Sequence, residues 1–211
     1  MNVIPVPAIG DVGHVRHMHW WPPISGMIHF ALNKWHRSWC RRHIKQYKEV
    51  LGTHDFIVVP CKESKYDRGA GESLAAKGTV ITPWEVYLER IKSGECEVWI
   101  FDTGFTWPER CKCVEWWGTN CLGKSYDWRA IKNLLLKIMF SSFSDKLKDG
   151  KFAFFCTESV QRTLEQVKNV YQCKHATPMH TEQVAGMLSR KDGTYTSLTL
   201  KFKAGKDGAT W

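Results

Sequence analysis

The sequence lacks any run of roughly eighteen or more apolar residues, the length that predicts a membrane-spanning helix. It also lacks a signal peptide, because the opening stretch Val-Ile-Pro-Val-Pro is interrupted by prolines and has no basic start. No internal repeat and no low-complexity tract appears. These absences exclude the usual signals for membrane insertion and export, and they predict a cytoplasmic protein.

Closely spaced Cys-x2-Cys pairs are missing as well, although the chain has eight cysteines. An alternative is a structural zinc held by Cys111, Cys113, Cys121 and a histidine, but the Cys-x-Cys spacing is unusual for zinc and no second close pair follows. Eight cysteines in a chain of this length do not resemble a small disulfide framework. We therefore expect free thiols in a reducing compartment, with no metal and no cofactor.

The length of 211 residues favours one domain over residues 1–211, since it allows a single substantial core. The contents of 43% hydrophobic and 13% aromatic residues argue against disorder. Residues 1–23 carry prolines on both sides of His14, His17 and His19, a pattern that predicts an irregular lead segment. The core of the domain is expected at 50–185.

Residues 24–48 predict a basic helix that carries tryptophans. Its apolar side chains recur at helical spacing, and lysines and arginines occupy the rest of its surface. With a net charge of +9, such a helix could bind a membrane surface, an anionic polymer or nucleic acid. Packing of the Trp face on the core, with the basic face in water, is the simpler interpretation.

The stretch from Lys151 to Leu164 (KFAFFCTESVQRTL) predicts a buried strand that runs directly into a helix beginning at Cys156. Helix N-termini present unpaired N–H groups and a positive partial charge, which stabilise a thiolate. The same N–H groups could hold an oxyanion. A buried, inert thiol is the alternative, so a nucleophilic Cys156 needs a histidine partner.

His54 is the best candidate for that partner, because it opens the apolar strand Phe56–Val59 after a glycine turn. Glu72 follows eighteen residues later and precedes a second apolar segment, Gly78–Ile81, which is expected to form the neighbouring strand. A carboxylate there could orient His54 and stabilise its imidazolium, as in a triad of nucleophile, base and orienting group.

Taken in order, these segments resemble the circularly permuted papain-like hydrolases, the YiiX-like branch of the NlpC/P60 superfamily, which also includes lecithin retinol acyltransferase-like enzymes. The matching segments are Thr53–Val59, Glu72–Pro83, Leu122–Asp127 and Phe155–Val160, with a later Ala176–Pro178. The resemblance implies an α+β, permuted papain-like fold in which an antiparallel sheet packs against the nucleophile helix. It also implies Cys156 as the nucleophile, His54 as the base and Glu72 as the orienting residue.

The sequence thus favours a cysteine hydrolase of amide, peptide or ester bonds that forms a covalent acyl-enzyme. The resemblance suggests cell-wall peptides, in a bacterial or bacteriophage setting, or lipid esters and amides as substrates. Two alternatives stay open. One is an acyltransferase or thioesterase with the same triad, and the other is a non-catalytic basic module that binds nucleic acid or an anionic surface.

Further along the chain, Thr82-Pro83-Trp84-Glu85 predicts a capping box for a helix that ends near Ser93–Gly94. Residues 96–101 predict a strand, and alternating apolar residues from Leu198 to Phe202 predict a terminal strand. The segment Pro108–Lys124 gives no clear pattern.

Overall fold

The computed structural model describes residues 3–18, 52, 54–129, 132, 153–154, 156–167 and 198–211. The basic helix predicted at 24–48 and the Ala176–Pro178 segment lie outside these residues. Most of the predicted core, residues 3–18 and the C-terminal residues 198–211 lie within them.

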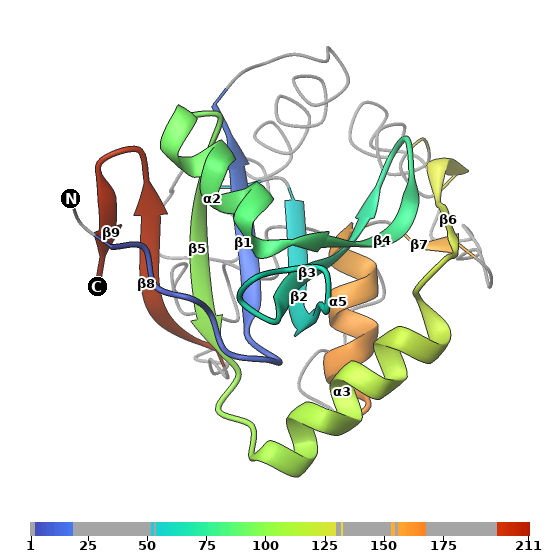
Figure 1. Ribbon diagram of the computed structural model, residues 1–211. Helices are drawn as coiled ribbons and strands as arrows, with labels where there is room; N and C mark the ends of the chain where they lie inside the picture. The colour runs from blue at the N-terminus through green and yellow to red at the C-terminus, as the bar shows by residue number, and fades with distance from the viewer. Residues whose placement is uncertain are drawn as a thin grey trace, which may run out of the picture.

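Seven strands form one antiparallel sheet in the order β4-β3-β2-β1-β5-β8-β9 (Figure 1). Their bounds are β1 Val12–His17, β2 His54–Pro60, β3 Arg68–Leu74, β4 Gly78–Pro83, β5 Cys96–Asp102, β8 Thr199–Gly205 and β9 Gly208–Thr210. A short parallel pair, β6 (Ser125–Tyr126) and β7 (Ala153–Phe154), lies beside it. The strand predicted before Cys156 is thus present among the described residues as the two residues of β7.

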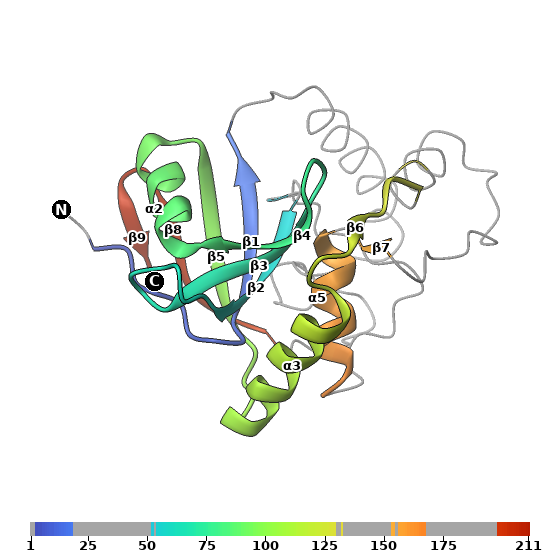
Figure 2. The same cartoon turned by 45° about the vertical axis from the view of Figure 1, so that its right-hand side comes forward.

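The described helices are α2 (Trp84–Ser93), α3 (Trp107–Asn120) and α5 (Cys156–Glu165), and they cover both faces of the sheet (Figure 2). α2 packs on one face in a cluster with Phe56 and Val58, whereas α3 and α5 pack on the other in a cluster with Ile57 and Val59. The protein is therefore α+β. Strand β2 lies between the two clusters and its side chains face them alternately, so residues 56–59 are all apolar. Among the described helices, none has both the length and the apolar character needed to cross a membrane.

The expectation of an irregular segment at residues 1–23 is wrong for residues 12–17, which form the central strand β1. β1 pairs with β2 on one side and with β5 on the other. Both of its faces are covered, so the sequence shows no alternation of apolar and polar residues. Gly13 also weakens the hydrophobic pattern of a strand, because it has no side chain. A Cβ atom there would lie 2.0 Å from Cζ of Phe56, so only glycine fits beneath that ring.

The helix predicted from Thr82 is present, but the predicted capping box is not. α2 ends as expected, with Gly94 in the left-handed conformation at φ 77°. The Thr82 hydroxyl, however, donates to Glu72, and Glu85 accepts from Ser64 instead of capping the helix. The unassigned segment Pro108–Lys124 is largely α3, whose own capping box is made by Thr106 and Glu109.

At the end of the sheet opposite the start of β2, a buried carboxylate ties several elements together. Asp11, which has no exposed surface, accepts from Arg110 at 2.8 Å and from Lys201 at 2.9 Å. Arg110 also donates to Asp102 and to the Ile9 carbonyl. These contacts join the segment before β1 to α3 and β8.

Candidate active site

Cys156 is the first residue of α5, and only 6% of its surface is exposed. α5 packs along β2 and β3 through Val160 and Leu164, which share a core cluster with Ile57 of β2. This packing brings the N-terminus of α5 to the end of the sheet where β2 begins. The helix terminus places the first backbone N–H groups of α5 and a positive partial charge around the thiol.

His54 is the first residue of β2 and pairs with Val15 of β1. Its side chain points to the face that α2 covers, as does that of Phe56, because side chains alternate along a strand. The pairing of Ile57 with Gly71 sets Glu72 beside Phe56 on that same face. His54 and Glu72 are therefore diagonal neighbours, and His54 Nε2 lies 2.6 Å from Glu72 Oε2.

Glu72 is held by two further hydrogen bonds and has no exposed surface. The Thr82 hydroxyl donates to Oε1 at 2.5 Å, and the Tyr87 hydroxyl donates to Oε2 at 2.6 Å. Burial alone would raise the pKa of Glu72, but the hydrogen bond and positive charge of His54, followed by those two donors, lower it. The carboxylate is thus fixed in place and ionised at neutral pH.

His54 and Cys156 lie within hydrogen-bonding reach of each other. Burial of the ring lowers the pKa of His54. The negative charge and hydrogen bond of the Cys156 sulfur, together with Glu72, outweigh burial and raise that pKa well above its ordinary value. Glu72 occupies Nε2, which leaves Nδ1 for the sulfur. The arrangement favours an imidazolium at His54, next to the Cys156 sulfur.

Three other cysteines lie in environments that disfavour the charged form of the thiol. Burial raises the pKa of Cys96, Cys113 and Cys121 to about 12 in each case. These thiols therefore stay protonated at neutral pH. Among the cysteines that the structure describes, Cys156 is the one beside a histidine with a raised pKa.

The structure brings together all three residues that the sequence proposed, Cys156, His54 and Glu72. Sequence reasoning missed the two donors that fix Glu72, Thr82 and Tyr87. Their contribution depends on the pairing of β3 with β4 and on the packing of α2, which no local pattern reports. For Thr82, the sequence offered a partial signal. Val80 of β4 pairs with Glu72, and Thr82, two residues later on the same strand, lies on the same face of the sheet as Glu72.

Two further aromatic residues border the site. The ring of His17 lies 6.2 Å from that of His54, and lost hydration, followed by the positive charges of His54 and Arg90, lowers the pKa of His17 to about 4. Burial, followed by the negative charges of Cys156 and Asp127, raises the pKa of Tyr126. Tyr126 contacts Trp128 edge to face, and 44% of Trp128 is exposed.

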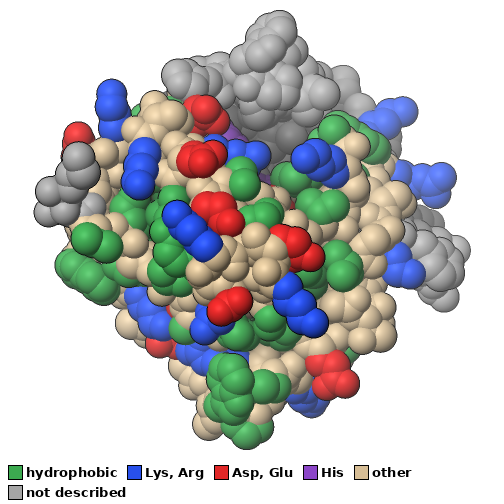
Figure 3. Space-filling view, viewed as in Figure 1, with side chains coloured by type: hydrophobic (Ala, Val, Ile, Leu, Met, Phe, Trp, Pro, Cys, Tyr) green, Lys and Arg blue, Asp and Glu red, His purple; other side chains and the backbone are tan. Residues whose placement is uncertain are grey.

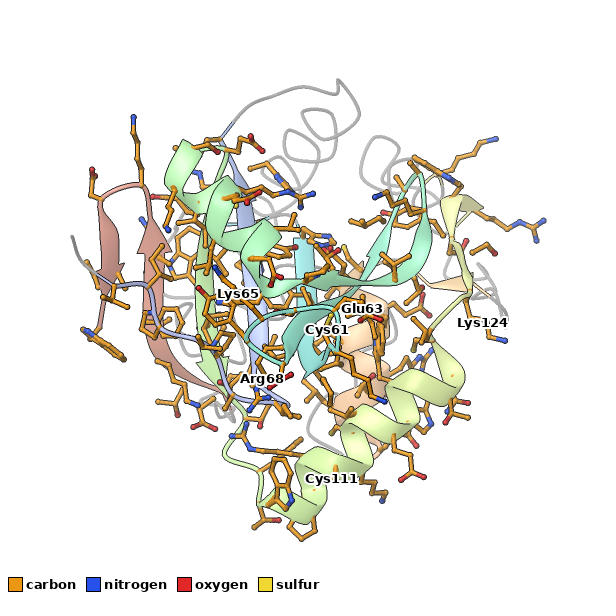
Figure 4. The ribbon with its side chains drawn as sticks, viewed as in Figure 1. Cys61, Glu63, Lys65, Arg68, Cys111 and Lys124 are labelled. Atoms are coloured by element: carbon orange, nitrogen blue, oxygen red, sulfur yellow. The ribbon has the colours of Figure 1, made fainter. Side chains whose placement is uncertain are left out.

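The zinc alternative finds no support in the geometry. Cys111 and Cys113 are two residues apart on α3, and such positions do not face each other on a helix. Cys111 is exposed (Figure 4), whereas Cys113 is buried and donates to the Thr163 carbonyl. Within the described ranges, no three His, Cys, Asp or Glu side chains are grouped so that they could hold a metal ion.

Comparison with family models finds no match, and comparison with curated protein sequences finds none either. Among solved structures, the chain is similar to the metalloprotein YiiX from Escherichia coli O157:H7, with 12% sequence identity and a TM-score of 0.46. The match covers 92% of this chain and 88% of that one. A similarity this low does not establish a family, so the permuted papain-like placement stays a prediction.

Proposed function

We propose that the protein is a cysteine hydrolase with a circularly permuted papain-like fold, which cleaves amide, peptide or ester bonds through a covalent acyl-enzyme. The observation that carries this proposal is the series of contacts from Cys156 through His54 to Glu72, contributed by α5, β2 and β3. A nucleophile, a base and a group that orients the base are the parts that such a catalyst needs.

In the first half-reaction, the Cys156 thiolate attacks the carbonyl carbon of the substrate and forms a carbon–sulfur bond. The displaced electron pair moves to the carbonyl oxygen, and backbone N–H groups at the start of α5 stabilise that oxyanion. When the tetrahedral intermediate collapses, the bond to the leaving nitrogen or oxygen breaks. The His54 imidazolium gives its proton to the leaving group, and the acyl group remains on Cys156 as a thioester.

In the second half-reaction, His54 is neutral and takes a proton from water as the water oxygen adds to the thioester carbon. The carbon–sulfur bond then breaks, releasing a carboxylic acid and restoring the thiolate beside the imidazolium. Glu72 stays ionised throughout and stabilises the imidazolium each time it forms. With an alcohol or amine in place of water, the same steps would make the protein an acyltransferase, and with a thioester substrate it would be a thioesterase.

The test is selective modification of Cys156 by a limiting amount of iodoacetamide at neutral pH, read by intact mass and peptide mapping. Cys156 should react faster than Cys111, even though Cys111 is exposed and Cys156 is almost buried. His54→Ala should remove this advantage while leaving Cys111 unchanged. Equal labelling of all thiols, or labelling of Cys111 first, would contradict the proposal.

A basic binding module is the candidate from a different class. On the face shown in Figure 3, lysines and arginines are interspersed with aspartates and glutamates, which does not favour a continuous basic patch there. Binding to an anionic polymer that falls steeply with salt, and that survives alkylation of Cys156, would favour this candidate over the hydrolase.

A further inference from the structure

A second chain of buried polar side chains, formed by Thr157, Asp55 and His14, lies on the face of the sheet opposite Glu72. The Thr157 hydroxyl donates to Asp55 Oδ2 at 2.5 Å, and Asp55 Oδ1 lies 2.7 Å from His14 Nδ1. None of the three side chains has exposed surface. Burying a carboxylate is costly unless hydrogen bonds satisfy it, so this arrangement must be well formed in the folded state. The proposed reaction uses none of these groups.

Each of the two residues that form the first hydrogen bond is next to a residue of the proposed triad. Asp55 follows His54 at the start of β2, and Thr157 follows Cys156 at the start of α5. The hydrogen bond between them spans 102 positions of the chain. Val160 and Leu164 of α5 share an apolar core cluster with Ile57 of β2, and apolar contacts have no directional preference.

His14 completes the arrangement from the central strand. It pairs with Asp55 in the β1–β2 ladder, one position from the pair formed by Val15 and His54. The contact between His14 Nδ1 and Asp55 Oδ1 fixes the orientation of the carboxylate, so that its other oxygen, Oδ2, points toward Thr157. The position of α5 relative to β2 is thereby set at the end where the sulfur meets the imidazole.

The Thr157 hydroxyl also lies beside the nucleophile, with its oxygen 3.9 Å from Cys156 Sγ. Since its hydrogen is donated to Asp55, the hydroxyl does not donate to the sulfur. Donation to the sulfur from His54 therefore meets no competition from Thr157. Loss of Asp55 or of the Thr157 hydroxyl would change both the position and the surroundings of the thiol.

We propose that Thr157, Asp55 and His14 are positioning residues that set the separation between Cys156 Sγ and the His54 ring, and so control the reactivity of the thiol. This inference rests on the proposed function, because it concerns the same nucleophile and base. The residues act through Cys156 and His54 and do not touch the substrate.

Thr157→Val tests the inference, because valine keeps the shape of threonine and removes only the hydroxyl. Thr163→Val is the matched control: Thr163 is equally buried on α5, but its hydroxyl donates to the Ser159 carbonyl within the helix. The readouts are the rate of Cys156 alkylation by iodoacetamide between pH 5 and 9, and the kcat and KM for p-nitrophenyl acetate. Both are measured well below the melting temperature of each variant.

A displacement of about 1 Å at a reacting group can cost roughly 100-fold in rate. We expect Thr157→Val to slow Cys156 alkylation roughly 10- to 100-fold, with kcat lowered in parallel and KM little changed. Thr157→Ser should keep the wild-type rate, as should Thr163→Val. If Thr157→Val fails to fold, Thr157→Ala and its control Thr163→Ala provide the same comparison.

The outcomes separate the two proposals. A fast Cys156 in the wild type that stays fast in Thr157→Val overturns the positioning role and leaves the hydrolase proposal intact. A wild-type Cys156 that reacts no faster than the other thiols overturns both. A slow Thr157→Val together with an equally slow Thr163→Val would show a general effect of helix stability, and it too overturns the positioning role.

Discussion

The Nε2 atom of His54 lies 2.6 Å from Oε2 of Glu72, and the Tyr87 hydroxyl lies 2.6 Å from the same oxygen. The carboxylate therefore receives a hydrogen bond from helix α2 and contacts the ring from strand β2. A base held in this way keeps one tautomer and one orientation, which leaves Nδ1 for the Cys156 thiol. The geometry predicts a graded loss of function as these contacts are removed one at a time.

Glu72→Gln should lower turnover roughly 10- to 1000-fold without unfolding the protein, since glutamine keeps the shape but removes the charge that stabilises the imidazolium. The pKa of His54 should fall accordingly, and NMR titration of the imidazole would measure it. Tyr87→Phe removes one donor only and should have a smaller effect in the same direction. A Glu72→Gln enzyme with full activity would move the orienting role to another residue.

The same variant should change how stability depends on pH. The pKa of Glu72 is lowered in the folded state, so its contribution is fully present above the ordinary value of 4.5 and is lost as pH falls through the folded-state pKa. The pKa of His54 is raised, so its contribution is complete below 6.5 and is lost as pH rises through the folded-state value. Denaturation of the wild type and of Glu72→Gln from pH 3 to 9 would measure the difference. Parallel curves would contradict this assignment.

Cys156→Ala should abolish turnover, because it removes the atom that forms the acyl bond, while the fold survives the loss of a small buried thiol. His54→Ala should be almost as severe, since it removes the group that takes and returns the proton. Intact mass after p-nitrophenyl acetate should show one added acetyl group in the wild type and none in Cys156→Ala. Acetylation that persists in Cys156→Ala would reject the mechanism.

The triad could be proposed from sequence because each member stands at the edge of an apolar run. Cys156 ends one, His54 opens another and Glu72 precedes a third. The hydrogen bond from Thr157 to Asp55 could not be proposed, because it depends on how α5 is placed against β2. Strand β1 was missed for a different reason: with both faces covered, its His14 is buried against Asp55 and breaks the hydrophobic pattern that a strand prediction needs.

Arg110→Met should destabilise the protein by about 3–5 kcal/mol, since it leaves the fully buried Asp11 carboxylate without one of its two cationic partners. Lys203→Met is the control, because Lys203 bonds Glu97 at 2.6 Å but both side chains are partly exposed. That pair should contribute only about 0–1 kcal/mol. Urea denaturation compares the two variants. Equal effects would show that burial of Asp11 does not set the strength of its contacts.

Gly13→Ala tests the placement of β1 directly. The new Cβ atom would lie 2.0 Å from Cζ of Phe56, so the ring or the strand must move, at a cost of about 1–3 kcal/mol or more. Phe56→Leu should relieve the clash, and the double variant should be more stable than the sum of the single effects predicts. Gly118→Ala in α3 is the matched control: its Cβ meets nothing within 4 Å, and alanine should stabilise the helix by about 0.5–1 kcal/mol. If Gly13→Ala proved as harmless as Gly118→Ala, β1 could not lie beneath the Phe56 ring, and the central position of this strand would be wrong.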